Sequence, residues 1–293
     1  MDGAIVVDKP EGWTSHDVVA KMRGIARTRR IGHLGTLDPI ATGVLPLVLE
    51  RATRLAQFYT RSDKIYEGTV RFGWATNTYD RAGTPVGEQK DVAVDATELE
   101  ALLERFRGEI LQTPPPVSAK KVDGKRAYDL ARQAVALELE PVKVSVYELT
   151  LLSVDGAVAR LRAHCSGGTY MRALAHDLGQ LLGCGAHLQE LRRTASAEFE
   201  IGEARTLEQL QSLAAEDRLI DAIVPASKML PRMASVYVDD VTAAHIRHGR
   251  NFPASPFRPE AASRHVKALT REGELVAIGE AVLPNLYHPV VVL

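Results

Sequence analysis

The chain has 293 residues, of which 45% are hydrophobic and 25% are charged, and its formal net charge at pH 7 is −1. This composition is ordinary for a globular protein with a substantial core, and it argues against a fibrous or low-complexity chain. The longest apolar stretches, such as residues 43–49, are far too short to cross a bilayer, so we expect no membrane segment.

The start of the chain and its cysteines bear on the cellular compartment. An acid, Asp2, follows Met1 directly, so no signal peptide is expected there. The sequence holds two cysteines, Cys165 and Cys184, and no CxxC pair. We therefore expect neither a disulfide scaffold nor a structural zinc site, and a reducing cytoplasm fits.

Charged residues are segregated along the chain. Seven basic residues and two acids lie between positions 21 and 54, and residues 120–132 hold five more basic residues: Lys120, Lys121, Lys125, Arg126 and Arg132. Acids concentrate in residues 88–109 and 198–240. Such segregation is typical of a protein with one basic face for phosphates, although basic clusters can also be plain solvated surface.

The first part of the chain mixes strands, loops and one helix. Residues 3–8 read as a buried strand that ends in a turn at Pro10 and Gly12. Thr14, with Asp17 three positions later, forms a capping-box arrangement that opens a helix. A loop rich in Gly and Pro and two further strands are expected next, at residues 32–43, 44–49 and 67–72.

The middle of the chain continues this mixture. Thr97 and Glu100 form a capping box that predicts a helix to about residue 106. Next, a strand hairpin is expected around Asp155 and Gly156. A helix is expected over residues 169–182, with leucines 174, 178 and 181 facing the core. A short helix opened by Thr206 and Gln209 follows.

The character of the sequence changes after Pro225, where prolines accumulate. Short strand-like pieces follow at residues 235–238, 265–269, 275–277 and 289–293. These indicate a small β-rich module over residues 231–293. The first 230 residues lack a regular βαβ rhythm, so an α+β domain with a mixed, mostly antiparallel sheet flanked by helices is predicted.

One loop has the composition of a functional site. Residues 32–43 hold three glycines, which allow tight turns and close approach of backbone to a ligand. Asp38 precedes Pro39 and is thereby kept out of the helical region, which places its carboxylate on an extended corner. His33 lies nearby. The loop therefore offers a carboxylate and an imidazole for chemistry, although a plain Asx-Pro turn would have the same pattern.

Residues 30–43 resemble the GHxGTLDPxATG motif of the TruB family of pseudouridine synthases, which modify uridine 55 in the T-loop of tRNA. Further stretches resemble, in order, the opening strand and turn of the family, its lysine-x-tyrosine motif, its RNA-clasping insertion, its CSxGTYxRxL motif and its LxxLRR element: residues 5–15, 63–68, 115–128, 165–174 and 188–193. Ordered matches of this kind are far more specific than a single motif. The C-terminal module is similar to a PUA domain, an RNA-binding module.

The resemblance implies a fold, a partner and an activity. The fold would be that of the pseudouridine synthases, with a catalytic domain over residues 1–230, an RNA-clasping insertion at about 113–140, and the PUA-like domain after it. The substrate would be the T-arm of tRNA. No cofactor, metal or obligate protein partner is implied, and a cytoplasmic monomer is expected.

The resemblance also assigns roles to single residues. Asp38 would act as nucleophile or base, Tyr66 would stack on the target uracil, and Arg172 would pair with Asp38. The remaining residues would contact the flipped nucleotide or support the site: His33, Tyr170 and Leu191 for contact, and Lys9, Lys64 and Asp80 for support. The chain has Leu34 where the family more often has a small or hydroxyl residue.

Three classes of function stay open from the residues alone: an RNA-modifying enzyme, a non-catalytic RNA-binding protein on the same fold, and a hydrolase that cleaves a nucleoside or glycoside. A pure binder need not retain the carboxylate, and a hydrolase would carry a second placed carboxylate, for which Asp80 is a formal candidate. Other candidates for chemistry are weaker. Cys165 is expected to be a buried structural thiol, and His245 and His248 to lie in a polar turn.

Overall fold

The structure is a computed structural model that describes residues 1–116, 121–122, 125–126, 140–254 and 264–293. Most of the predicted clasping insertion lies outside these residues, including Lys120 and Arg132. Its described part includes two short strands that pair antiparallel, β8 (Lys121–Val122) and β9 (Lys125–Arg126). None of the described helices is both long and apolar enough to cross a membrane.

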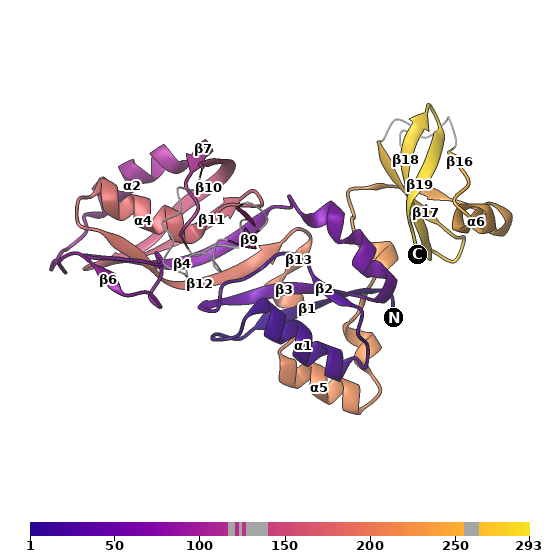
Figure 1. The fold of residues 1–293 in the computed structure, drawn as a ribbon, viewed down its shortest axis with the longest axis horizontal. Coiled ribbons are helices and arrows are strands. Elements are labelled where there is room, and N and C mark those ends of the chain that lie inside the picture. The colour runs from indigo at the N-terminus through magenta and orange to yellow at the C-terminus, as the bar shows by residue number, and fades with distance from the viewer. Residues whose placement is uncertain (117–120, 123–124, 127–139, 255–263) are drawn as a thin grey trace.

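A mixed sheet forms the body of the larger part (Figure 1). In the residues that the structure describes it has ten strands, eight of which follow one another in space: β14 (Val224–Pro225), β1 (Gly3–Lys9), β3 (Ala41–Leu49), β12 (Ala186–Ser196), β4 (Lys64–Phe72), β11 (Val158–Cys165), β10 (Val142–Asp155) and β7 (Gly108–Gln112). Two short strands pair at the side, β2 (Ile31–His33) with β3 and β13 (Phe199–Glu200) with β12. Adjacent strands are antiparallel except β3 and β12. The predicted α+β class and mostly antiparallel sheet are confirmed.

Helices flank this sheet and bury its apolar side chains. Two of them, α1 (Ser15–Ile25) and α5 (Leu207–Ala215), lie side by side near β1, whereas α2 (Ala96–Leu103) and α4 (Met171–Leu181) lie at the other end, near β7 and β10 (Figure 1). Short 3-10 helices complete the domain: η1 (Glu50–Tyr59), η2 (Glu104–Phe106), η3 (Ile201–Glu203), η4 (Leu219–Ala222) and η5 (Ala226–Lys228). A continuous core joins α1 and α4 through residues such as Val18, Leu47, Tyr66, Leu174 and Leu188.

Helix starts follow from local capping chemistry. The predicted capping boxes of Thr14 with Asp17 and of Thr206 with Gln209 are both present, so each satisfies backbone N–H groups that the first helical turn leaves unpaired. The predicted cap at Thr97 is wrong, because α2 begins one residue after Asp95, whose carboxylate accepts from the backbone N–H of Glu98.

Two expectations about the helices need further correction. The helix expected from residue 169 begins at Met171, after an N-cap at Tyr170. The leucines at 174 and 178 are fully buried as expected, but Leu181, the last residue of α4, is 43% exposed.

The C-terminal part forms a second, smaller sheet. It has five described strands in the order β15 (Ala234–Tyr237), β17 (His265–Leu269), β18 (Leu275–Leu283), β19 (Leu286–Val292) and β16 (Phe252–Pro253). The strands expected at residues 275–277 and 289–293 are longer than predicted. The polar turn expected around His245 and His248 is wrong, because helix α6 (Asp240–Arg247), capped by Asp239, occupies this region.

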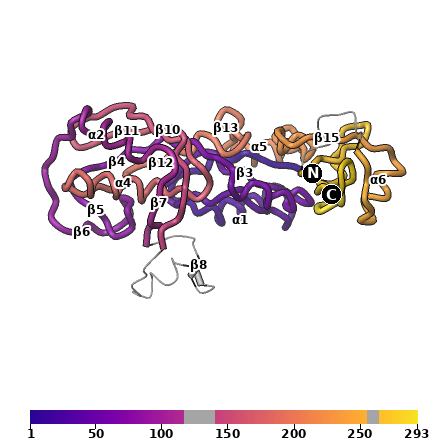
Figure 2. Tube along the Cα trace, turned by 90° about the horizontal axis from the view of Figure 1, so that it is seen from above, coloured from indigo at the N-terminus to yellow at the C-terminus, as the bar shows by residue number. Residues whose placement is uncertain are grey.

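The two parts pack against each other at one end of the large sheet, where the tube in Figure 2 shows both chain termini. Ile278, Val291 and Leu293 of the small sheet join a core with Val48 and Met229. The buried ammonium group of Lys267 donates to the carbonyls of Ser227 and Met229, 3.1 Å from each. The division at residues 230 and 231 stays a prediction.

Candidate active site

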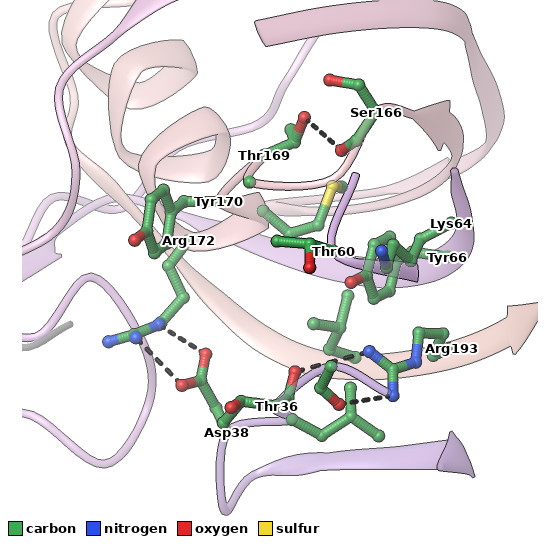
Figure 3. Close-up of a pocket in the computed structure, with 15 residues that line it drawn as sticks. Thr36, Asp38, Thr60, Lys64, Tyr66, Ser166, Thr169, Tyr170, Arg172 and Arg193 are labelled. Atoms are coloured by element: carbon green, nitrogen blue, oxygen red, sulfur yellow. Dashed lines mark hydrogen bonds and ion pairs between the residues drawn. The ribbon is translucent and has the colours of Figure 1, made fainter. Parts of the chain in front are cut away.

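A cavity of about 220 Å³ opens between the loop that carries Asp38, the strands β4 and β12, and the start of α4 (Figure 3). Of the predicted site residues, it is lined by Asp38, Lys64, Tyr66, Tyr170, Arg172 and Leu191. These residues come from four separate stretches of the chain, and the sheet brings them together. His33, Lys9 and Asp80 do not line this cavity.

Asp38 and Arg172 form a two-pronged ion pair at the cavity. Arg172 Nε lies 2.9 Å from Asp38 Oδ2, and Nη2 donates to Oδ1 over 3.0 Å. The Arg172 side chain is 6% exposed, whereas that of Asp38 is 35% exposed. A planar guanidinium matches both oxygens of a carboxylate and stays charged at any physiological pH. The pair therefore orients the carboxylate while leaving part of it open to a ligand.

Arg172 is itself held from its other side. Its Nη1 donates to the carbonyl of Thr78 over 3.1 Å and lies 3.5 Å from Asp80 Oδ2. Asp80 is buried and accepts from Thr78 Oγ1 and the backbone N–H of Ala82, at 2.7 and 3.0 Å. The segment around Asp80 thus fixes the direction from which Arg172 approaches Asp38.

The segment that carries Asp80 is tied to two other elements. Its backbone exchanges hydrogen bonds with Leu188 of β12, at 2.9 Å to both Tyr79 and Arg81. Tyr79 adopts a positive φ of 66°, which is uncommon for a residue with a side chain. Its ring stacks on His176 of α4, with centroids 3.8 Å apart and planes 10° apart. These contacts hold the strained residue next to Asp80.

Arg193 lies beneath the Asp38 loop and is only 1% exposed. Its Nε donates to the carbonyl of Val44 over 2.7 Å, and its two terminal nitrogens donate to Gly35 and Thr36, at 3.1 and 3.4 Å. Figure 3 shows this side chain between Tyr66 and the loop. Arg193 is a functional residue that was not predicted from the sequence. Its position within the stretch that resembles LxxLRR was the only signal for it.

Tyr66 and two lysines surround the loop. Tyr66 is buried in the cavity wall, and burial raises the pKa of its hydroxyl. Lys9 Nζ donates to the carbonyls of Trp13, Pro10 and Pro39, at 2.6, 2.9 and 3.4 Å. Lys64 donates to the carbonyl of Ser62. Burial lowers the pKa of both lysines to about 8. Lys9 therefore fixes the residue after Asp38 from outside the cavity.

Strand pairing and burial place the other residues of this region. His33 ends β2, where it pairs with Leu47 of β3. Leu34, the departure from the family pattern, is buried in the core beneath η1 rather than facing the cavity. Cys165 is buried as expected, and burial raises its thiol pKa to about 11. Within the described part of the chain, no group of three or more His, Cys, Asp or Glu residues is placed to hold a metal ion.

Comparison with protein-family models decides the family. Residues 23–171 match the TruB family pseudouridylate synthase (N terminal domain), and residues 172–231 match the tRNA pseudouridylate synthase B C-terminal domain. The chain belongs to the TruB family.

TruB relatives cover the whole chain. It is 74% identical over 293 residues to tRNA pseudouridine synthase B of Solibacter usitatus, covering 100% of both chains. It is 42% identical over 252 residues to tRNA pseudouridine synthase B of Aquifex aeolicus, covering 85% of this chain and 86% of the relative.

Solved structures show the same fold. The crystal structure of a Cbf5-Nop10-Gar1 complex contains a chain with a TM-score of 0.73 and 30% identity, matched over 97% of this chain and 79% of that one. The structure of an H/ACA RNP bound to a substrate RNA containing 2′-deoxyuridine contains a chain with a TM-score of 0.74 and 28% identity, matched over 99% of this chain and 84% of that one. The pseudouridine-synthase fold expected from the TruB resemblance is confirmed.

Proposed function

We propose that this chain isomerises uridine 55 in the T-loop of tRNA to pseudouridine, with Asp38 as the catalytic carboxylate. Membership of the TruB family supports tRNA pseudouridine synthesis. The observation that carries the residue assignment is the two-pronged ion pair of Asp38 with Arg172, which lies in the wall of the same cavity as Tyr66.

The reaction breaks the bond between uracil N1 and ribose C1′, turns the base, and joins C5 to C1′. Product and substrate are isomers, so the atoms balance without a redox partner or a transferred group. Asp38 either attacks C1′ or takes the proton from C2′, and both routes need the ionised carboxylate. Arg172 orients this carboxylate for either route, because its Nε and Nη2 lie 2.9 and 3.0 Å from the two carboxylate oxygens.

Tyr66 supplies a flat ring on which the flipped uracil stacks, and its hydroxyl relays the proton that leaves C5. Because burial raises the pKa of this hydroxyl, it is fully protonated before the reaction begins and can pass a proton on. Tyr170 and Leu191 line the same cavity and enclose the base from its other sides. Extrusion of a base into such a pocket is how enzymes reach a target atom inside stacked RNA.

The surrounding residues keep Asp38 in place. Lys9 holds the carbonyl of Pro39, Asp80 braces Arg172, and Lys64 lies in the cavity wall beside Tyr66. His33 lies at the start of the same loop and contacts the flipped nucleotide. The basic residues between positions 21 and 54 bind phosphates of the T-arm. The enzyme acts as a monomer in the cytoplasm.

The substitution Asp38→Asn tests this function. An amide has nearly the same shape, but it can neither attack C1′ nor accept the C2′ proton. We expect tRNA binding within a few fold of wild type, since phosphate contacts dominate affinity. Mass spectrometry should find no pseudouridine in unmodified tRNA after a single turnover with excess enzyme.

The matched control is Asp8→Asn. Asp8 makes a similar two-pronged ion pair with Arg192, at 3.0 and 2.8 Å, outside the cavity lining. This variant should retain pseudouridine formation. A rate for Asp38→Asn within about tenfold of wild type would refute the catalytic role, since loss of a covalent or basic catalyst should cost several kcal/mol. Release of free uracil by wild-type enzyme would identify a hydrolase instead.

A further inference from the structure

A second cavity of about 530 Å³ shares no lining residue with the catalytic one and is lined by basic, aromatic and amide side chains. Its wall includes Arg71 at the end of β4, Trp74 just beyond that strand, Arg81, and two residues of β12, His187 and Gln189. All its lining residues belong to the described part of the chain, and none of them is acidic. Two guanidinium groups beside an indole and an amide favour an anionic, aromatic ligand.

Arg71 is the anomaly that points to a ligand. Its guanidinium lies 5.2 Å from the centroid of the Trp74 ring. Its Nε is buried and has no hydrogen-bond partner among the residues that the structure describes. In contrast, Arg160 on the neighbouring strand β11 pairs with Glu67. An arginine nitrogen buried without an acceptor is costly, so the Arg71 side chain gains a hydrogen bond if it turns its guanidinium toward an oxyanion in the cavity.

Strand β12 has an irregular register next to Arg71. His187 lies directly opposite Arg71 in the register of β12 and β4, and the register shifts between Leu188 and Glu190. Gln189 is therefore the extra residue of a bulge, a feature that redirects side chains next to binding sites. A glutamine amide both donates and accepts, as reading the edge of a base requires.

We propose that this cavity binds a second nucleotide of the same RNA, with its phosphate on Arg71 and its base against Trp74. Arg81 at the wall adds positive charge, although it also pairs with Glu11. The proposal deepens the proposed function and rests on it, since it names a further contact to the RNA substrate. The phosphate chemistry alone would also suit free phosphate or a mononucleotide.

The cavity lies close to the catalytic network but is separate from it. Arg81 follows Asp80, whose carboxylate braces Arg172. Along β12, Gln189 is two residues from Leu191, which is about 7 Å of strand. However, Arg71 lies on the face of β4 opposite to Tyr66, since the residues of this strand alternate in burial. The bound nucleotide is therefore not the target uridine but another one of the same RNA.

Trp74 offers a direct test, because the chain has only two tryptophans and the other is Trp13. In a Trp13→Phe variant, Trp74 is the sole indole fluorophore. Titration with unmodified tRNA should quench its emission in parallel with binding, whereas inorganic phosphate and uridine monophosphate at the same concentrations should not. Quenching by either small anion at those concentrations would assign the cavity to a free ligand and overturn the RNA proposal.

The phosphate contact is tested with Arg71→Gln, and the matched control is Arg160→Gln. Loss of one contact to single-stranded RNA should lower the slope of log Kd against log salt by about 0.7 and raise Kd about three- to tenfold. The control should change neither. An unchanged slope for Arg71→Gln, or a Trp74 emission that tRNA leaves unaltered, would overturn the proposal. Pseudouridine formation by the same proteins at saturating tRNA reports separately on the proposed function.

Discussion

Replacing Arg172 by methionine should destabilise the fold chiefly through Asp80 rather than through Asp38. The substitution removes the guanidinium that lies between the two carboxylates, and it keeps a long side chain that helices accept. Asp38 is 35% exposed, so water can replace much of what it loses. Asp80, whose side chain is 9% exposed, keeps only its hydroxyl and backbone donors.

The magnitude follows from this asymmetry. Removing one partner of a buried ion pair typically costs about 3–5 kcal/mol, because the other charge stays buried without compensation. Loss of the ion pair with the partly exposed Asp38 adds no more than about 1 kcal/mol to this cost. We therefore expect Arg172→Met to lower the free energy of unfolding by about 3–4 kcal/mol. Adding Asp80→Asn removes the buried charge that the loss of Arg172 leaves uncompensated, so the double variant should recover about 2 kcal/mol of that loss.

Urea unfolding of the wild type, both single variants and the double variant gives the coupling energy directly. The m-values should agree among the four proteins, so that midpoint differences report stability alone. A coupling energy near zero would refute this account, and so would a loss below about 1 kcal/mol for Arg172→Met. The double variant should stay inactive in single turnover, because Asp38 still lacks its partner.

Further substitutions test single steps of the argument. Tyr66→Phe keeps the stacking ring and loses the hydroxyl, so tRNA affinity should hold while the single-turnover rate falls about 10²–10⁴-fold; a wild-type rate would leave Tyr66 as a stacking surface only. Burial raises the pKa of Asp177 to about 6, so the folded state binds more protons than the unfolded state between pH 4 and 6. The free energy of unfolding therefore falls as pH rises through this range, and Asp177→Asn should flatten that fall in urea titrations. Iodoacetamide should label native protein at Cys184 only, since Cys165 is buried and its thiol pKa is about 11, and peptide mapping that finds equal labelling of both would contradict the structure.

Local chemistry made parts of the fold predictable from the sequence. Thr14 and Thr206 each carry their capping partner three residues ahead, so both helix starts could be read without tertiary contacts. At α2 the predicted cap, Thr97, lies two residues after the observed cap, Asp95, because both residue types can cap and only packing decides which turn comes first. Leu181 has the spacing of a core residue, but burial depends on what lies opposite, which spacing does not reveal.

Strand β12 shows why other parts were not predictable. It supplies Leu191 to the cavity wall and Arg193 to the loop, yet its residues include charged and polar side chains and a bulge breaks their alternation. The family resemblance supplied Asp38, Tyr66 and Arg172 as a set. Their geometry depends on contacts between residues more than 100 positions apart, such as the 134 between Asp38 and Arg172, and no local pattern reports these.

The parallel pairing of β3 with β12 has a consequence for how the protein is made. The carbonyls of Gly35, Thr36 and Val44 are synthesised early, but the arginine that binds them is at position 193, at least 149 residues later. At about 5–20 residues per second, the ribosome delivers that side chain roughly 7–30 s after the loop. Throughout this interval the nascent chain carries the Asp38 loop without its support. The catalytic centre therefore assembles only in the last third of translation. A nascent chain truncated before β12 should not form a folded active site.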